Sequence, residues 1–199
     1  MIGLIYYDSI FGVESNSSDI VSKKILIISG SPRKNGNSDV LCDRFRSGAE
    51  DAGNEVRKVS LAKKKVGFCK GCYHCRDHDG RCVLNDDMSE IMDDIGWADT
   101  IVLASPVYFY SVDAQMKAVI DRTVACWTAI KNKEFYYIMT AAEDSDTVMD
   151  CTLECFRGFA RCLGGSVEKG VIYGKGLYGI GEVEKTPYMD EAYDMGRKV

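Results

Sequence analysis

Four cysteines lie close together at intervals that suit metal binding: Cys69, Cys72, Cys75 and Cys82. The intervals are two, two and six residues. The first three thiolates can close around one face of a cubane of four irons and four sulfides, and the fourth can reach the remaining iron. A zinc site with four cysteine ligands needs the same donors, although zinc more often uses two separated Cys-x-x-Cys pairs. A loop that binds no metal is the third alternative, and the spacing alone leaves all three open.

A second stretch suited to ligand binding is residues 29–38, which read Ser-Gly-Ser-Pro-Arg-Lys-Asn-Gly-Asn-Ser. It follows an apolar run at 25–28 and precedes a helical pattern, so it is a strand-to-helix junction. Such a junction aims backbone N–H groups and the positive end of the helix dipole at one point, where an anion binds. We expect a phosphate there, held by Ser31, Arg33, Asn37 and Ser38. The alternative is a plain turn in which Asn37 or Ser38 only caps the helix.

A third stretch, residues 105–112, carries three aromatic side chains directly after an apolar run. It reads Ser-Pro-Val-Tyr-Phe-Tyr-Ser-Val, and its proline ends the strand. A flat heteroaromatic ring can be held at such a loop by stacking and by main-chain hydrogen bonds. The alternative is that Tyr108, Phe109 and Tyr110 pack in the core or at an interface, which is the commoner role of aromatic side chains.

Alternating strands and helices must position these loops. Apolar runs at 25–28, 101–104 and 135–142 indicate buried strands, and weaker patterns at 55–61 and 167–173 indicate strands nearer the edges. Helical patterns lie between them, at 41–52, 88–95, 112–127, 148–163 and 188–198. This alternation predicts an α/β fold of three layers (α/β/α) with a five-stranded parallel sheet of order 2-1-3-4-5. In that order the loops after the first and third strands meet at the topological switch point, where open sheets bind ligands.

Length and composition narrow the function classes. At 199 residues and 46% hydrophobic, the chain suits one compact domain with room for a cofactor cleft. The net charge of −5, without a dense basic stripe, argues against nucleic-acid binding. No apolar run reaches the ~20 residues of a membrane span, and no export signal is recognisable, so we expect a cytoplasmic protein without membrane contact and with reduced thiols. The other five cysteines fall on apolar helical faces, where we expect small core residues: Cys42, Cys126, Cys151, Cys155 and Cys162.

Four motifs together resemble those of the flavodoxin-like NAD(P)H-dependent FMN reductases: residues 29–38, Asp86-Asp-Met88, Ser105-Pro-Val-Tyr108 and Met116-Lys-Ala-Val-Ile-Asp-Arg122. The resemblance runs from about residue 25 to the C-terminus. It implies a flavodoxin-like fold in which the FMN phosphate is held by Ser31, Arg33, Asn37 and Ser38. The isoalloxazine ring would be bordered by Pro106, Val107, Tyr108 and Phe109, with residues 140–142 as further candidates.

The cysteine loop resembles that of the iron-sulfur flavoproteins, a branch of the same fold that combines FMN with a [4Fe-4S] cluster. The cluster would be held by Cys69, Cys72, Cys75 and Cys82. Cluster-free relatives can resemble this loop too. We expect the flavodoxin-like domain at 25–199, with the Cys-rich loop at 66–85, and an N-terminal extension at 1–24.

The resemblance implies an FMN-dependent NAD(P)H oxidoreductase. Electrons would pass from the nicotinamide through FMN, and through a cluster if one is bound, to a small molecule or a redox protein that the sequence does not identify. Because the cofactor carries this chemistry, no catalytic side chain is expected. The alternatives are a cluster-free FMN or quinone reductase, a flavodoxin-like electron carrier without catalytic turnover, and a redox or metal sensor. Relatives usually close the flavin with a second subunit, so we expect a homodimer or homotetramer.

Overall fold

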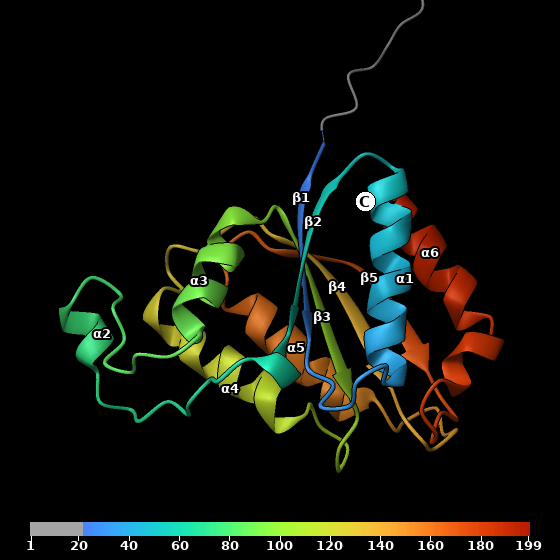
Figure 1. Cartoon of the computed structure of the whole chain (residues 1–199). Helices are drawn as coiled ribbons and strands as arrows, with labels where there is room; N and C mark the ends of the chain where they lie inside the picture. The colour runs from blue at the N-terminus through green and yellow to red at the C-terminus, as the bar shows by residue number, and fades with distance from the viewer. Residues whose placement is uncertain (1–21) are drawn as a thin grey trace, which may run out of the picture.

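Five parallel strands form the centre of the computed structural model, which describes residues 22–199 (Figure 1). They are β1 (Lys24–Ser29), β2 (Glu55–Ser60), β3 (Thr100–Pro106), β4 (Glu134–Thr140) and β5 (Val167–Gly174). The strand order is β2-β1-β3-β4-β5, and every neighbouring pair is parallel. The predicted α/β fold and its order 2-1-3-4-5 are therefore confirmed. The predicted extension at 1–24 lies outside the described residues, apart from its last three.

Helices cover both faces of the sheet (Figure 1). One face carries α1 (Asn37–Asp51) and α6 (Tyr188–Arg197), and the other carries α3 (Met88–Trp97), α4 (Ala114–Arg122) and α5 (Asp150–Arg161). Two apolar clusters result, one on each side of the sheet. In β1, Leu26 and Ile28 belong to the first cluster, whereas Ile25 and Ile27 belong to the second. Because successive strand residues point to opposite faces, a strand covered on both sides must be apolar at every position.

The edge strands carry a weaker apolar pattern because each has a neighbour on one side only. In β2 the residues alternate between exposed and partly buried, and only Val59 is fully buried within the strand. In β5 the first three residues are exposed, and burial begins toward Ile172. The sequence therefore placed both weak strands correctly at the edges.

The helices α1 and α6 cross at two glycines. A Cβ at Gly48 would lie 2.1 Å from the backbone oxygen of Tyr193, and a Cβ at Gly196 would lie 2.1 Å from the backbone oxygen of Phe45. Real Cβ atoms do not approach so closely, so only glycine permits this contact between the two backbones. The pair fixes the position of α1, whose first turn ends the stretch 29–38 that is predicted to bind phosphate, hereafter the phosphate loop.

The predicted helix at 112–127 is shorter in the structure. It runs from Ala114 to Arg122 as α4 and is followed by a 3-10 turn, Thr123–Ala125. The apolar side chains of Val124 and Trp127, which extended the predicted pattern, are exposed. The apolar periodicity predicted too long a helix, because these two residues border a cavity beside the cysteine loop and do not pack on the sheet.

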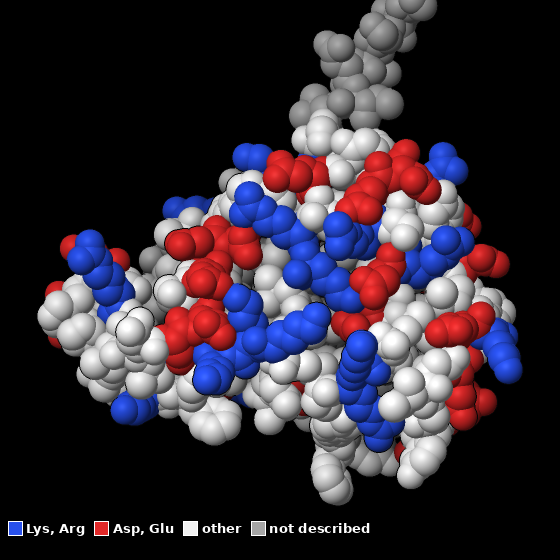
Figure 2. All heavy atoms as spheres, in the orientation of Figure 1, with Lys and Arg blue, Asp and Glu red and all other residues white. Residues whose placement is uncertain are grey.

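The cysteine loop projects from the α3 and α4 side of the sheet. Its short helix α2 (His74–Asp77) stands apart from the layered body (Figure 1). On the face drawn in Figure 2, Lys and Arg side chains are interspersed with Asp and Glu side chains. No helix within residues 22–199 combines the length and apolar character needed to cross a membrane.

Candidate functional site

The loops after β1 and β3 lie side by side, because these strands are neighbours in the sheet. The backbone N–H of Gly30 donates to the oxygen of Ala104 over 2.8 Å, which continues the strand pairing into the loops. A Cβ at Gly30 would lie 2.1 Å from Oδ2 of Asp113, so the loop after β1 packs directly on this carboxyl group. The structure thus brings the two predicted ligand loops together at the carboxyl end of the sheet.

The phosphate loop ends at the start of α1. Gly36 is the N-cap residue and has no side chain to cap the helix. The first backbone N–H groups of α1 therefore face the loop without a side-chain acceptor at the N-cap. A Cβ at Gly36 would lie 2.4 Å from Oγ of Ser31, so the loop closes tightly around this hydroxyl. Ser38 is 1% exposed, and its Oγ has no hydrogen-bond partner among the described residues. A buried hydroxyl without a partner at a helix N-terminus suits the binding of an anion, which would accept a hydrogen bond from the hydroxyl.

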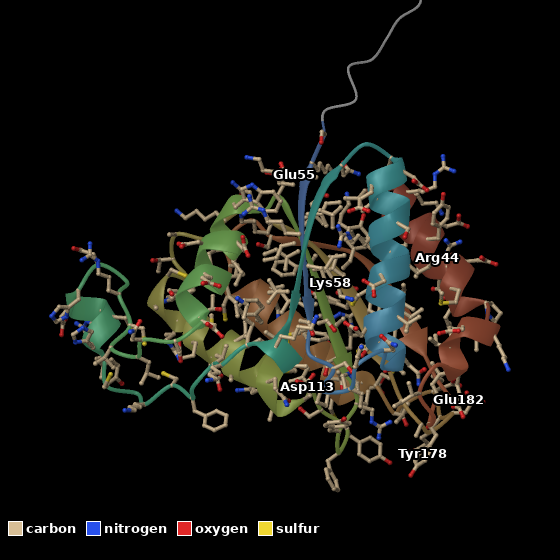
Figure 3. The ribbon with its side chains drawn as sticks, in the orientation of Figure 1. Arg44, Glu55, Lys58, Asp113, Tyr178 and Glu182 are labelled. Atoms are coloured by element: carbon tan, nitrogen blue, oxygen red, sulfur yellow. The ribbon has the colours of Figure 1, made fainter. Side chains whose placement is uncertain are left out.

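Two of the predicted phosphate ligands also contact a distant segment, residues 177–183. The Nδ2 of Asn37 donates to the backbone oxygen of Gly179 over 2.8 Å, and its Oδ1 accepts from the N–H of Val183 over 3.3 Å. Arg33 is exposed and donates through one guanidinium nitrogen to the backbone oxygen of Tyr178 over 3.3 Å. The side-chain amide of Asn37 therefore holds the phosphate loop against residues 177–183. Arg33 keeps further N–H donors that a ligand can use. Figure 3 shows Tyr178 at this end of the molecule.

The loop after β3 forms a tight hairpin. Tyr108 and Ser111 exchange two backbone hydrogen bonds, of 2.9 and 3.1 Å. The two residues between them, Phe109 and Tyr110, have positive φ values of 50° and 61°. Left-handed backbone is costly for such side chains, and it turns the three rings outward: all are exposed, and Phe109 is completely so. Core packing of these aromatic residues is therefore excluded.

The predicted ring-binding residues lie at the start of this hairpin. Pro106 and Val107 are partly buried where β3 ends. The N–H of Val107 donates to the backbone oxygen of Thr140 over 2.8 Å, which places the end of β4 beside them. The hydroxyl of Tyr110 donates to Glu143 over 3.0 Å, from the hairpin to the loop after β4. These contacts hold the carboxyl ends of β3 and β4, and the loops that follow them, side by side.

Asp113 is a functional candidate that the sequence reasoning missed. It is fully buried, its Oδ1 accepts from the N–H of Met116 as the cap of α4, and its Oδ2 lies 2.7 Å from Oγ of Ser105. Burial raises the pKa of this carboxyl group. Ser105 Oγ also lies 2.7 Å from the backbone oxygen of Pro106 and accepts from the N–H of Asp113 over 2.9 Å, so Ser105 links Asp113 to the end of β3. The signal in the sequence was an N-cap residue before the 114–122 helix.

The four predicted metal ligands line one cavity of about 700 Å³. Cys69 and Cys72 are exposed, and Cys75 and Cys82 are partly buried. Within residues 22–199, no three His, Cys, Asp or Glu side chains lie close enough together to hold a single metal ion. The donor set therefore fits an iron-sulfur cluster in chemistry and in sharing a cavity, while the loop holds the four thiols apart.

Five cysteines outside the loop were expected to be core residues, and the expectation is confirmed fully for Cys42 alone. Cys42 is buried, and that burial raises the pKa of its thiol. Cys126 and Cys155 are only partly buried, and Cys151 and Cys162 are exposed. Core burial was therefore wrong for Cys151 and Cys162, because their helix positions face away from the sheet. Cys126 lies in the wall of the cysteine cavity instead.

A buried ion pair closes the cysteine loop at its base. Arg122 is 2% exposed and donates to both carboxylate oxygens of Asp86, over 2.8 and 3.0 Å. This hydrogen bonding lowers the pKa of Asp86, and it raises the pKa of Arg122 with a smaller contribution from the neighbouring Cys82. Both residues belong to motifs of the resemblance, but their pairing was not predicted. The available signal was a charged residue on the apolar face of α4, three positions after Val119.

Solved structures share this fold. An azoreductase of Bacillus anthracis str. Sterne superposes with a TM-score of 0.71 at 13% identity, over 89% of this chain and 100% of that one. An NAD(P)H:quinone oxidoreductase from Methanothermobacter marburgensis gives a TM-score of 0.66 at 15% identity, over 89% of this chain and 96% of that one. At such identities the likeness shows the fold alone, and it confirms the predicted flavodoxin-like fold.

Sequence relatives are more specific. An iron-sulfur flavoprotein of Archaeoglobus fulgidus is 44% identical over 99 residues, which cover 50% of this chain and 44% of that protein. An iron-sulfur flavoprotein of Methanosarcina thermophila is 42% identical over 113 residues, which cover 55% of this chain and 59% of that protein. The chain thus spans about half the length of the curated relatives it matches. The model of the NADPH-dependent FMN reductase family matches residues 23–149, which include both ligand loops and the cysteine loop. The chain belongs to the NADPH-dependent FMN reductase family.

Proposed function

We propose that this protein is an FMN-dependent oxidoreductase that takes electrons from NADH or NADPH. The observation that carries the proposal is the buried, unpartnered hydroxyl of Ser38 at the uncapped start of α1, in the loop whose Gly30 contacts Ala104 and Asp113. An anion bound there would satisfy the hydroxyl and the first N–H groups of the helix together. A ring attached to that anion would reach the neighbouring hairpin.

The phosphate of FMN would be held by Ser31, Arg33 and Ser38 with the first N–H groups of α1. Ser31 and Ser38 are buried and face a closed loop, whereas Arg33 is exposed and can fold over the bound group. Its charge makes it the strongest single partner for a phosphate. We assign Asn37 mainly a bracing role, since its side-chain amide is engaged by residues 177–183.

The isoalloxazine ring would lie against the hairpin after β3, bordered by Pro106, Val107, Tyr108 and Phe109, with residues 140–142 nearby. When bound, FMN supplies the hydride acceptance and electron transfer of the reaction. The residues that border the ring would orient it and limit its contact with water. The exposed rings of Phe109 and Tyr178 would be available to contact a nicotinamide or an acceptor.

We infer that the cysteine loop holds a [4Fe-4S] cluster through Cys69, Cys72, Cys75 and Cys82. The four thiols line one cavity, and the relatives most similar in sequence include proteins named iron-sulfur flavoproteins. A bound cluster would supply single-electron transfer. The loop projects from the body of the protein, with two of the four cysteines exposed and two partly buried. We expect the loop to bring the four thiols together when iron is supplied.

The first experiment is an anaerobic ultraviolet-visible spectrum of freshly purified protein, with iron and acid-labile sulfide measured on the same sample. Flavin bands with a broad shoulder near roughly 400 nm and about four irons per chain would support the whole proposal. Flavin bands without iron would leave a cluster-free FMN or quinone reductase. A protein that binds no flavin, even after incubation with FMN, would refute the proposal.

Anaerobic stopped-flow mixing with NADH and NADPH separates an enzyme from an electron carrier. A reductase bleaches the flavin absorbance rapidly with at least one of the two nucleotides, and the faster one identifies the donor. A carrier retains FMN but reacts slowly with both. Candidate acceptors, a quinone and a redox protein, are then tested for reoxidation of the reduced flavin.

We also infer a homodimer or homotetramer in solution. Apolar side chains are exposed in the hairpin after β3, at Phe109, and in residues 177–183, at Tyr178 and Ile180. Exposed apolar side chains of this size suit contact with a second subunit. Light scattering on the purified protein measures the mass directly, and a monomer at micromolar concentration would refute this part.

A further inference from the structure

The cysteine loop is closed at a narrow neck. The N–H of Asp87 donates to the oxygen of Lys65 over 3.1 Å, and the N–H of Lys65 donates back to the Asp87 carboxylate over 2.6 Å. One step further in, the N–H of Gly67 donates to Oδ2 of Asp86 over 2.8 Å. The two ends of the loop are therefore joined by backbone and carboxylate contacts before the first cysteine and after the last.

Arg122 fills this neck from α4. One of its terminal nitrogens donates both to Asp86 and to the backbone oxygen of Gly67, at 2.8 Å each, and the other donates to Asp86 at 3.0 Å. The Asp86 carboxylate thus accepts from Arg122 twice, from Gly67 and from the N–H of Met88. A single buried side chain therefore holds both ends of the loop on the body of the protein.

The same arginine faces the cysteines. It lines the cavity that the four thiols share, and its charge lies next to Cys82. Its Nε is buried and has no hydrogen-bond partner among the described residues, whereas its two terminal nitrogens make three hydrogen bonds, to Asp86 and Gly67. The arginine therefore places positive charge in the wall of the cavity, while its hydrogen bonds are directed to the neck of the loop.

We propose that Arg122 is a positioning residue for the metal site, which fixes the neck of the cysteine loop and places a permanent positive charge beside the thiolate array. The proposal rests on the proposed iron-sulfur site. Four thiolates around an iron-sulfur cluster carry net negative charge, so a fixed cation stabilises both assembly and the reduced state. Hydrogen-bonded partners outside the ligands commonly control metal affinity in this way.

Two pairs of variants test the proposal in the full-length protein. Arg122→Gln removes the positive charge and part of the paired hydrogen bonding to Asp86. Arg122→Lys keeps the charge but cannot form the two parallel hydrogen bonds to Asp86. Asp86→Asn keeps the shape of the partner and weakens the pair. The control is Arg157→Gln, which removes another two-pronged arginine pair, 2.7 and 2.8 Å from Glu168, at a surface remote from the cysteine cavity.

Three measurements should distinguish a role of Arg122 in positioning the cysteine loop from a general effect on protein stability. Competition with an iron chelator should show about 10- to 100-fold weaker iron retention in Arg122→Gln and Asp86→Asn, but not in Arg157→Gln. The reduction potential of the iron-sulfur centre should fall in Arg122→Gln and stay near the wild-type value in Arg122→Lys. In protein stripped of iron, amide hydrogen exchange at Gly67 and Asp87 should become about a hundredfold faster in Arg122→Gln.

Wild-type iron retention and wild-type neck exchange in folded Arg122→Gln would overturn the proposal. If Arg122→Gln does not fold, the same comparison is decided by Arg122→Lys and Asp86→Asn. If the wild type itself binds no iron, the iron-sulfur assignment fails, and the exchange of the neck amides alone decides whether Arg122 positions the loop. Equal losses in Arg157→Gln would show a general stability effect and would also overturn it.

Discussion

Replacing Ser38 with alanine should change FMN affinity and the stability of the FMN-free protein in opposite directions. The Oγ of Ser38 is buried and has no partner in the described part of the chain. Without FMN, this hydroxyl is a desolvated polar group, and its removal should stabilise the protein by about 1 to 3 kcal/mol. For a chain of this length, that is a rise of roughly 2 to 10 °C in Tm. With FMN, the lost bond to a phosphate is worth about 1.5 to 3 kcal/mol, or roughly 10- to 100-fold in Kd.

The assays are differential scanning calorimetry of the FMN-free protein and titration of flavin fluorescence. FMN should also raise the Tm of Ser38→Ala less than that of the wild type, because stabilisation by a ligand follows its affinity. A matched control is Thr152→Val, since Thr152 is likewise fully buried in a helix with an unpartnered Oγ1. This control should gain stability similarly and leave the Kd for FMN unchanged.

Two results would refute this reasoning. An FMN affinity of Ser38→Ala within twofold of the wild type would show that the hydroxyl does not contact the phosphate. A lower Tm of the FMN-free variant would show that the hydroxyl already has a partner. Weakened FMN binding in Thr152→Val would show that changes in the core affect the site indirectly. The lower FMN affinity of Ser38→Ala would then be no evidence for a contact between Ser38 and the phosphate.

Four further variants test other parts of the structure. Arg33→Ala should weaken FMN binding about 10- to 100-fold through a lost charge-assisted bond, and an unchanged Kd in a fluorescence titration would contradict the phosphate-loop assignment. Burial raises the pKa of Asp113, so its contribution to stability is complete below the unfolded pKa of about 4 and is lost as the pH rises through the folded value. Denaturant unfolding from pH 3 to 8 should therefore show that Asp113→Asn loses less stability on raising the pH than the wild type, and parallel pH profiles would argue against a raised pKa. Phe109→Gly should raise the Tm by up to about 6 °C, because glycine removes about 1 to 2 kcal/mol of left-handed strain at φ 50° and costs about 0.5 to 1 kcal/mol in backbone entropy; a lower Tm would show that the exposed ring stabilises the fold. Gly196→Ala should destabilise the protein by about 1 to 3 kcal/mol in chemical denaturation, because the new Cβ meets a backbone oxygen at 2.1 Å, and wild-type stability would show that α1 and α6 separate without cost.

The sheet was predictable because burial dictates composition strand by strand. The run Ile25–Ile28 must be apolar throughout, since its alternate side chains enter different cores, and the patterns of β2 and β5 weaken where one neighbour is missing. Strand order then places the loops after β1 and β3 together. The helix at 112–127 was overestimated for a related reason: periodicity records apolar spacing, and Val124 and Trp127 keep that spacing while facing the cavity.

The details of the site depended on contacts that no local pattern encodes. Asn37 looks like a phosphate ligand from its neighbours in sequence, but its amide is engaged by Gly179, which lies 142 positions away. Asp113 and Gly30 meet only because β1 and β3 are adjacent, and the pair of Arg122 and Asp86 joins two motifs that are 36 positions apart. Residue types and strand order thus predicted which loops lie together, while the contacts that each side chain makes within its loop depended on the tertiary structure.

The helix α4 explains why the two candidate sites occupy fixed positions on one chain. Its N-terminus is capped by Asp113, which packs on the phosphate loop at Gly30 and hydrogen-bonds the end of β3. Its last residue, Arg122, holds the neck of the cysteine loop. Nine helical residues at about 1.5 Å each separate these ends by roughly 13 Å. Because a packed helix neither stretches nor bends easily, α4 sets the distance between the loops at the carboxyl end of the sheet and the neck of the cysteine loop.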